Sequence, residues 1–168
     1  MIEFNLNPIA GDLTFDDLPL GIDTEEGFCK SGLYHELIKR KAVNKTMPNH
    51  YLVDSVAFFD KEFQVTIRPV CYGFPFMLHL VDKNSQYYYA LNDWNARTNI
   101  HMQNESVKSL SDWLKESLNL DTPDTTETDM IRWRFEWGRV SDSYEIKSFN
   151  HGIYLAWNIM YLLPDKVI

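Results

Sequence analysis

Two segments of this chain alternate apolar and polar residues with a period of two, and this pattern limits the folds open to it. In the first segment Phe63, Val65 and Ile67 alternate with polar residues, and the second runs from 131 to 137. A period of two is typical of a β-strand with one buried face. Apolar or aromatic runs predict three further strands, at 51–59, 74–81 and 87–91. The short spacings favour an antiparallel meander.

Two helices are predicted, one before the first of these strands in the sequence and one before the segment 131–137. The segment 105–119 carries an apolar stripe at helical spacing, and Asn104 is its expected N-cap. A second helix is expected over 24–43. The segment 153–163 is apolar almost all round, so periodicity does not separate a helix from a strand there, and its length favours a buried helix.

The expected fold class is therefore α+β. We predict a largely antiparallel sheet of five or six strands, packed by two or three helices. A chain of 168 residues fits one globular domain, 1–168, and four Pro or Gly residues within 1–23 predict that this segment is irregular.

The negative charge of the chain is localised. The net charge is −8, and residues 1–29 hold seven acids but neither Lys nor Arg. A second patch with acids alone lies within 121–129. Such a field attracts basic partners and repels phosphates. The alternative interpretation is a solvated acidic loop without a partner. The candidate partner-binding acids are Asp12, Asp16, Asp17, Asp23, Glu25, Glu26, Asp121, Asp124, Glu127 and Asp129.

Motifs for catalysis, cofactors or metals are not found in the sequence. The glycines form no phosphate-binding loop, the serines form no nucleophile elbow, and the histidines and two cysteines have no metal-ligand spacing. We therefore predict no catalytic residue, no cofactor and no metal. The first residues lack the features of a signal peptide, and the longest apolar stretch is shorter than the roughly 20 residues that span a bilayer. A cytoplasmic location is expected.

Two further groups of residues are candidates for binding. Arg132 and Arg134 share one face of a predicted strand with Glu136. One interpretation is a solvated sheet face with a cross-strand ion pair, and the other is an anion-binding pair of arginines in a sheet-lined cleft. Tyr88 and Trp94 belong to an aromatic run, and exposed aromatic residues often anchor protein interfaces.

The stretch LPLGIDTEE at residues 18–26 resembles the LG-(S/T)-xx-E sequence before the first helix of some small α+β immunity and inhibitor domains. In size and acidity the chain also resembles bacterial immunity proteins, which neutralise polymorphic or contact-dependent toxins. The resemblance implies a non-catalytic protein whose partner is a basic toxin domain, without nucleic-acid or membrane binding. Two alternatives remain open. One is a small enzyme or ligand-binding domain that uses Arg132, Arg134 and a histidine, and the other is a phage-type inhibitor that mimics nucleic acid.

Overall fold

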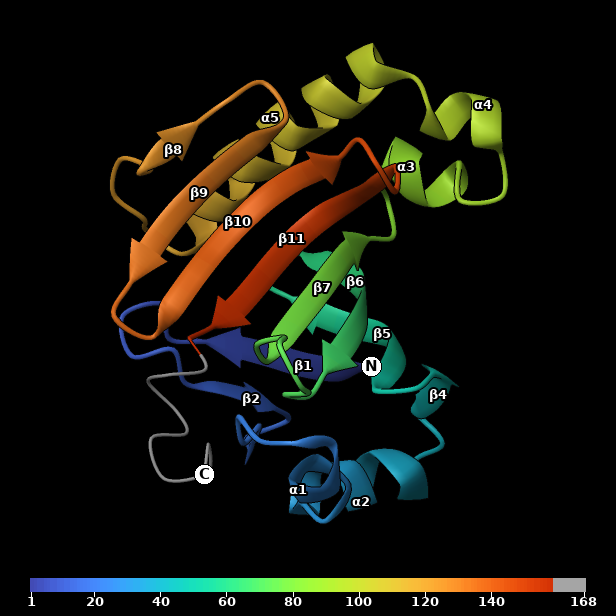
Figure 1. The fold of residues 1–168 in the computed structure, drawn as a ribbon, viewed down its shortest axis with the longest axis vertical. Coiled ribbons are helices and arrows are strands. Elements are labelled where there is room, and N and C mark those ends of the chain that lie inside the picture. The colour runs from blue at the N-terminus through green and yellow to red at the C-terminus, as the bar shows by residue number, and fades with distance from the viewer. Residues whose placement is uncertain (159–168) are drawn as a thin grey trace.

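The computed structural model describes residues 1–158, which form an α+β fold with eleven strands in one mixed sheet and five helices (Figure 1). The strands are β1 (Ile2–Leu6), β2 (Leu13–Phe15), β3 (Leu18–Pro19), β4 (Val43–Met47), β5 (His50–Phe58), β6 (Lys61–Arg68), β7 (Met77–Asp82), β8 (Thr125–Thr126), β9 (Met130–Phe135), β10 (Gly138–Glu145) and β11 (Asn150–Trp157). The helices are α1 (Glu25–Cys29), α2 (Gly32–Lys39), α3 (Gln86–Tyr89), α4 (Trp94–Arg97) and α5 (Ile100–Ser117). The sheet is thus larger than the five or six strands predicted.

Most of the sheet is built from two halves of similar plan. In each half helices precede four antiparallel strands: α1 and α2 precede β4 to β7, and α3 to α5 precede β8 to β11. The last strands of the two halves, β7 and β11, pair with each other at the centre. Strand β5 pairs with β4 near its start and with β1, in parallel, near its end. The pattern of elements therefore repeats, although the sequence shows no internal repeat.

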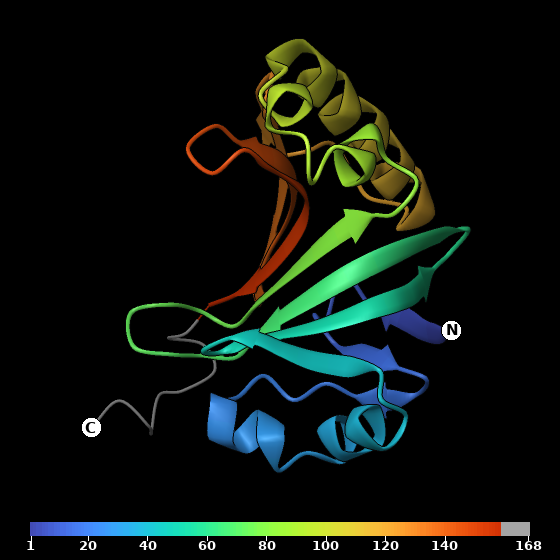
Figure 2. The same ribbon diagram turned by 90° about the vertical axis from the view of Figure 1, so that its right-hand side faces the viewer.

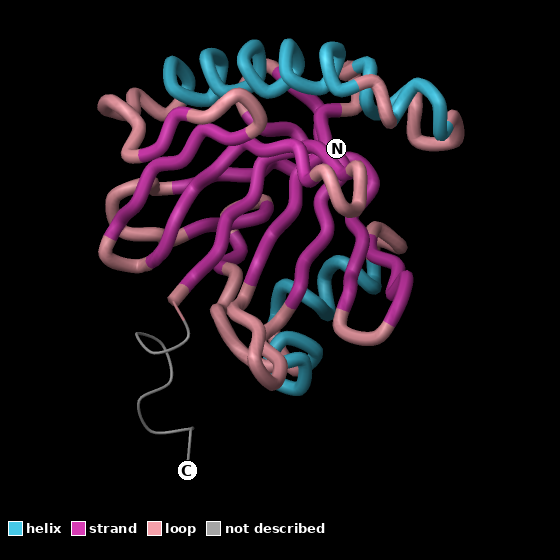
Figure 3. The backbone as a smooth tube through the Cα atoms, turned by 45° about the horizontal axis from the view of Figure 1, so that its top comes forward, coloured by secondary structure: helices cyan, strands magenta, loops and turns pink. Residues whose placement is uncertain are grey.

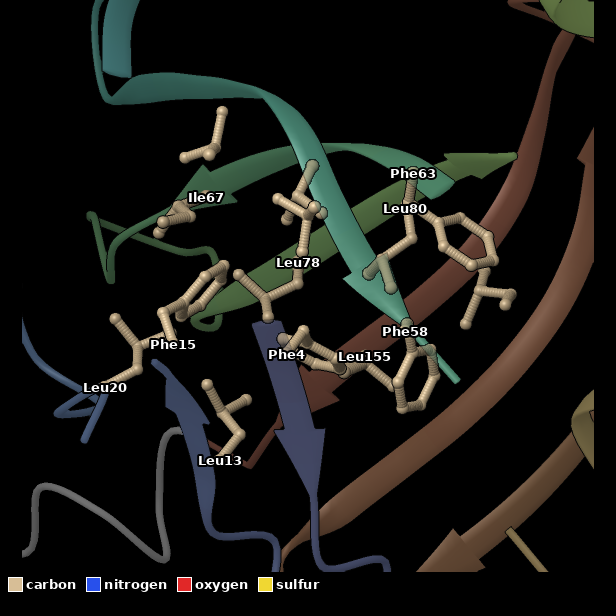
Figure 4. Close-up of a cluster of buried hydrophobic side chains, with 14 of the residues drawn as sticks. Phe4, Leu13, Phe15, Leu20, Phe58, Phe63, Ile67, Leu78, Leu80 and Leu155 are labelled. Carbon is tan, nitrogen blue, oxygen red and sulfur yellow. The ribbon is translucent and has the colours of Figure 1, made fainter. Parts of the chain in front are cut away.

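Helices from both halves pack on the same face of the sheet. On this face Phe28 of α1 contacts Tyr51 of β5 with ring centroids 5.0 Å apart, and Trp113 of α5 contacts Phe63 of β6 at 5.7 Å. Helix α5 lies against one end of the sheet and α1 with α2 against the other (Figure 3). The buried cluster between them includes Phe4, Phe58, Leu78, Leu80 and Leu155 (Figure 4).

The opposite face of the sheet is here called the open face. Among residues 1–158, no helix lies over it at β7, β9, β10 and β11 (Figure 1). In Figure 2 the open face of β11 is turned to the left, and α5 lies on the opposite side, to the right of β11. None of these helices has the length and apolar character needed to cross a bilayer.

The first 23 residues are more regular than predicted. Phe4 of β1 and Phe15 of β2 are buried, with their rings in edge contact at 5.3 Å. The turn between β2 and β3 consists of Asp16 and Asp17, whose φ angles are 47° and 64°. Two consecutive residues with positive φ match the twist of a tight hairpin, and Asp tolerates this conformation better than most residues.

Three predicted elements differ from the structure. The helix expected over 24–43 is divided into α1 and α2, because Ser31 accepts the N–H of Tyr34 and caps a new helix. The strand expected at 87–91 is instead helix α3, which Ser85 caps. The segment expected as a helix from residue 153 is strand β11 up to Trp157, where Tyr154 is half-buried and the other residues are buried, and 159–163 lie outside the described residues.

Candidate functional site

Three of the six N-terminal acidic candidates form ion pairs with described residues. Asp16 pairs with Arg40, Glu25 with Lys45 and Glu26 with Lys30. Hydrogen bonds from Lys45 and then from Tyr51 lower the pKa of Glu25 below its ordinary value. The bases follow the acids in sequence and return beside them in the fold. In the folded chain, bases from later in the sequence therefore neutralise part of the negative charge of residues 1–29.

The other acidic candidates are more dispersed. Asp12 and Asp17 are exposed in the loops on either side of β2, and the carboxylate of Asp23 accepts the N–H of Thr24. In the second patch, around β8, Asp121, Asp124 and Glu127 are exposed and Asp129 is half-buried. Strands β3 and β8 are at opposite ends of the strand order, so the structure divides the acidic candidates between two regions.

The aromatic candidates lie on short helices instead of a strand. Tyr88 of α3 is half-buried, whereas its neighbour Tyr89 is 74% exposed. Trp94 of α4 is 59% exposed and contacts Phe149 of the β10–β11 turn with ring centroids 4.9 Å apart. Trp94 therefore remains available as an anchor, and Tyr89 is a better second candidate than Tyr88.

The open face carries a row of residues that the sequence analysis did not assemble. Paired residues of neighbouring strands share a face of the sheet. Arg134 of β9 pairs with Arg139 of β10, and Arg139 with Ala156 of β11. Ala156 in turn pairs with Met77 of β7, and Met77 with Arg68 of β6. We call these five residues the arginine row.

A second row runs beside it on the same face. It consists of Arg132, Ser141, Tyr154, His79 and Thr66, one from each of the same five strands. The rings of His79 and Tyr154 are stacked, with centroids 4.3 Å apart and planes 6° apart. Desolvation lowers the pKa of His79 to about 4, so this ring is neutral near pH 7. The positive charge of the open face therefore comes from the arginines.

The arginines of the open face form no ion pair with the part of the chain that the structure describes. Among residues 1–158, none of Arg68, Arg132, Arg134 and Arg139 takes part in an ion pair. The cross-strand ion pair expected on this face is thus not formed by Arg132, Arg134 or Glu136 with the described residues. Desolvation and the neighbouring charges of Arg132 and Arg134 lower the pKa of Arg139.

A buried polar network lies on the helix-covered face. Ser111 of α5 donates to Asp142 Oδ2 at 3.0 Å, and His151 Nε2 lies 2.9 Å from Asp142 Oδ1. Burial raises the pKa of Asp142. A Ser–His–Asp catalytic triad needs the histidine beside the serine. Here the carboxylate separates them, so His151 does not activate Ser111, and the arrangement joins α5 to the sheet.

Two cavities border this helix. One, of about 450 Å³, lies between α5 and β8–β9 and has apolar walls that include Val107, Ile131 and Trp133. The other, of about 300 Å³, is polar and reaches His151 and Lys61. Neither is lined by Arg132 or Arg134, so the two arginines and a histidine do not form a common pocket in either place. Within the described part of the chain, no three His, Cys, Asp or Glu side chains are grouped as metal ligands.

Comparisons with protein-family models, with curated proteins and with solved structures find no match to this chain.

Proposed function

We propose that this chain is a non-catalytic binding protein that neutralises a protein partner, most specifically an immunity protein that inhibits a bacterial toxin domain. The observation that carries the proposal is the open face. Strands from both halves build it, no helix of residues 1–158 lies over it at β7 and β9 to β11, and its four arginines form no ion pair with the described residues. A rigid sheet needs little ordering on binding, which favours affinity.

The surrounding surface supports the same function. The exposed acids Asp121 and Glu127 flank β8, the strand next to the arginines of β9. They would steer a partner that carries basic residues, since charged groups at the rim of an interface mainly accelerate association. Trp94, which contacts Phe149 of the β10–β11 turn, and the exposed Tyr89 would add aromatic contacts.

The two alternative functions receive less support from the geometry. An enzyme would need a reactive group, and Ser111, Asp142 and His151 are buried in an order that does not activate the serine. A mimic of nucleic acid needs carboxylates spaced like phosphates over one surface. The candidate acids of this chain lie in two separate patches, and three of them form ion pairs with neighbouring bases.

The experiment is to identify a partner and measure its inhibition. The full chain, with an affinity tag, is used to capture proteins from a lysate of its native host, and captured proteins are identified by mass spectrometry. We expect a partner that forms a complex of defined stoichiometry by light scattering. Expressed alone, it should arrest growth of a test strain, and co-expression of the chain should restore growth. A partner that forms the complex but remains fully toxic would contradict the proposal.

A further inference from the structure

The arginine row has a definite length. Adjacent strands of a sheet are about 4.8 Å apart, so the three intervals from Arg139 to Arg68 span about 14 Å. Between them lie Ala156, which is 3% exposed, and Met77, a flexible apolar residue that is half-buried. The row thus has positive charge at both ends and an apolar floor in the middle.

The positive end on β9 and β10 has a cost in stability. Arg134 and Arg139 are directly opposite, and Arg132 is diagonal to Arg139. Like charges in such positions are destabilising. The Nε atoms of Arg132 and Arg68 are also buried without a hydrogen-bond partner among the described residues. Local conflicts of this kind are expected where a binding function requires them.

The chemistry of the row selects its ligand. Guanidinium groups bind carboxylates and phosphates through paired hydrogen bonds. A long polyphosphate chain would also meet the acidic remainder of a protein whose net charge is −8. A short segment with two carboxylates avoids this repulsion. In an extended peptide, residues i and i+4 lie on the same side and are about 13–14 Å apart, which matches the distance from Arg139 to Arg68.

We infer that the open face binds an extended acidic segment of a partner protein, laid across β10, β11, β7 and β6. One carboxylate is held between Arg134 and Arg139, and a second, four residues away, by Arg68. An apolar side chain between them rests on Met77, beside the buried Ala156. The inference rests on the proposed function and deepens it, because it specifies an acidic docking segment even where the partner as a whole is basic.

The test uses a labelled peptide that contains Glu-Ser-Leu-Ser-Glu, with fluorescence anisotropy as the readout for the full chain. Its control peptide carries Gln in place of both Glu residues. We expect the Glu peptide to bind at least tenfold more tightly. The double variant Arg134→Gln/Arg139→Gln and the single variant Arg68→Gln should each weaken binding at least tenfold. The matched control, Lys39→Gln/Lys41→Gln on the α2 side, removes equal charge and should leave binding unchanged.

Several results would overturn the inference. Equal binding of the Glu and Gln peptides would exclude carboxylate recognition. Equal loss of binding in the lysine control would show that only net charge matters. A 12-nucleotide single-stranded DNA that binds more tightly than the peptide, and is lost in the same arginine variants, would assign the row to phosphates. Unfolding curves for each variant separate a loss of fold from a loss of binding.

The peptide assay is independent of the toxin partner. If the peptide does not bind but a captured partner is still inhibited, the acidic-segment inference is wrong and the proposed function remains. If the peptide binds with the expected arginine dependence but the captured partner remains toxic in the complex, the inference about the row holds and the inhibitory function is wrong.

Discussion

His151 Nε2 lies 2.9 Å from Oδ1 of Asp142, and both side chains are at least 98% buried. The register of the β10–β11 hairpin places them on the face that α5 covers, where Ser111 completes the network. Buried polar groups of this kind are stable only when each is satisfied. The network therefore determines how α5 docks, and it assigns the helix to one face while the arginines occupy the other.

The hydrogen bond from Ser111 should contribute measurably to stability. The variant Ser111→Ala leaves the buried carboxylate of Asp142 with one donor fewer, which costs about 1–3 kcal/mol. Ser109→Ala is the matched control, since Ser109 is exposed on the same helix. Urea unfolding at pH 7 should show a loss for the first variant and a change within about 0.5 kcal/mol for the second. Equal effects would mean that the network does not anchor α5.

Stability should fall on acidification because of His79. Its pKa is about 4 in the folded chain against about 6.5 when unfolded, so the unfolded state binds a proton more readily. This contribution is complete above pH 6.5 and is lost as the pH falls towards 4.

The variant His79→Phe keeps a flat ring against Tyr154 but does not titrate. Between pH 7.5 and pH 4.5 the unfolding free energy of the natural chain should decrease by about 1–2 kcal/mol more than that of the variant, after allowance for solvent screening. The His79 resonances in an NMR titration give a direct check, and a midpoint near 6.5 would contradict the prediction.

Gly11 should resist substitution. Its φ is +76°, and a Cβ at this position would overlap the indole ring of Trp137. Gly11→Ala therefore combines backbone strain with overpacking, and we expect a loss of about 2–4 kcal/mol. At Gly21 an added Cβ meets no atom within 4 Å, so Gly21→Ala should change stability little. Chemical denaturation of the two variants compares them, and equal stability would show that the β1–β2 loop is not held against Trp137.

The two acidic patches should differ in their effect on association with a captured partner. Asp121→Lys/Glu127→Lys reverses exposed charges that form no ion pair with described residues, and should slow association several-fold at low salt. Glu25→Gln/Glu26→Gln removes acids that Lys45 and Lys30 already neutralise, and should change the rate by less than twofold. Stopped-flow association rates at two salt concentrations test this. A larger effect of Glu25→Gln/Glu26→Gln would show that the N-terminal acids, and not the acids around β8, steer the partner.

The pattern of apolar residues predicted part of the fold correctly. Strands β5, β6, β7 and β9 lie within or close to the predicted segments, and α5 starts only five residues before the expected position, with Asn99 as its cap. Other elements have patterns that mislead. In strand β11 every residue from His151 to Trp157 except Tyr154 is buried, so its apolar run resembles a buried helix. The tyrosines of α3 favour a strand by composition, but Ser85 caps a helix there.

The candidate site depended on register, which a single sequence does not specify. Arg132 and Arg134 were found because they alternate with apolar residues on one strand. Arg139 and Arg68 join them only through the pairing of β9, β10, β11, β7 and β6. The pairing of Asp16 with Arg40 is likewise a contact between distant segments, so the acidity along the chain overstated the acidity of the surface.

One measurement tests the open face most directly as the binding surface. Arg139 on the open face and Lys108 on the outer side of α5 are both exposed bases. Calorimetric titration of the captured partner with Arg139→Glu and with Lys108→Glu compares the two sides of the molecule. We predict that Arg139→Glu raises Kd at least tenfold and that Lys108→Glu leaves it unchanged. An unchanged Kd for Arg139→Glu, with a large increase for Lys108→Glu, would contradict the assignment.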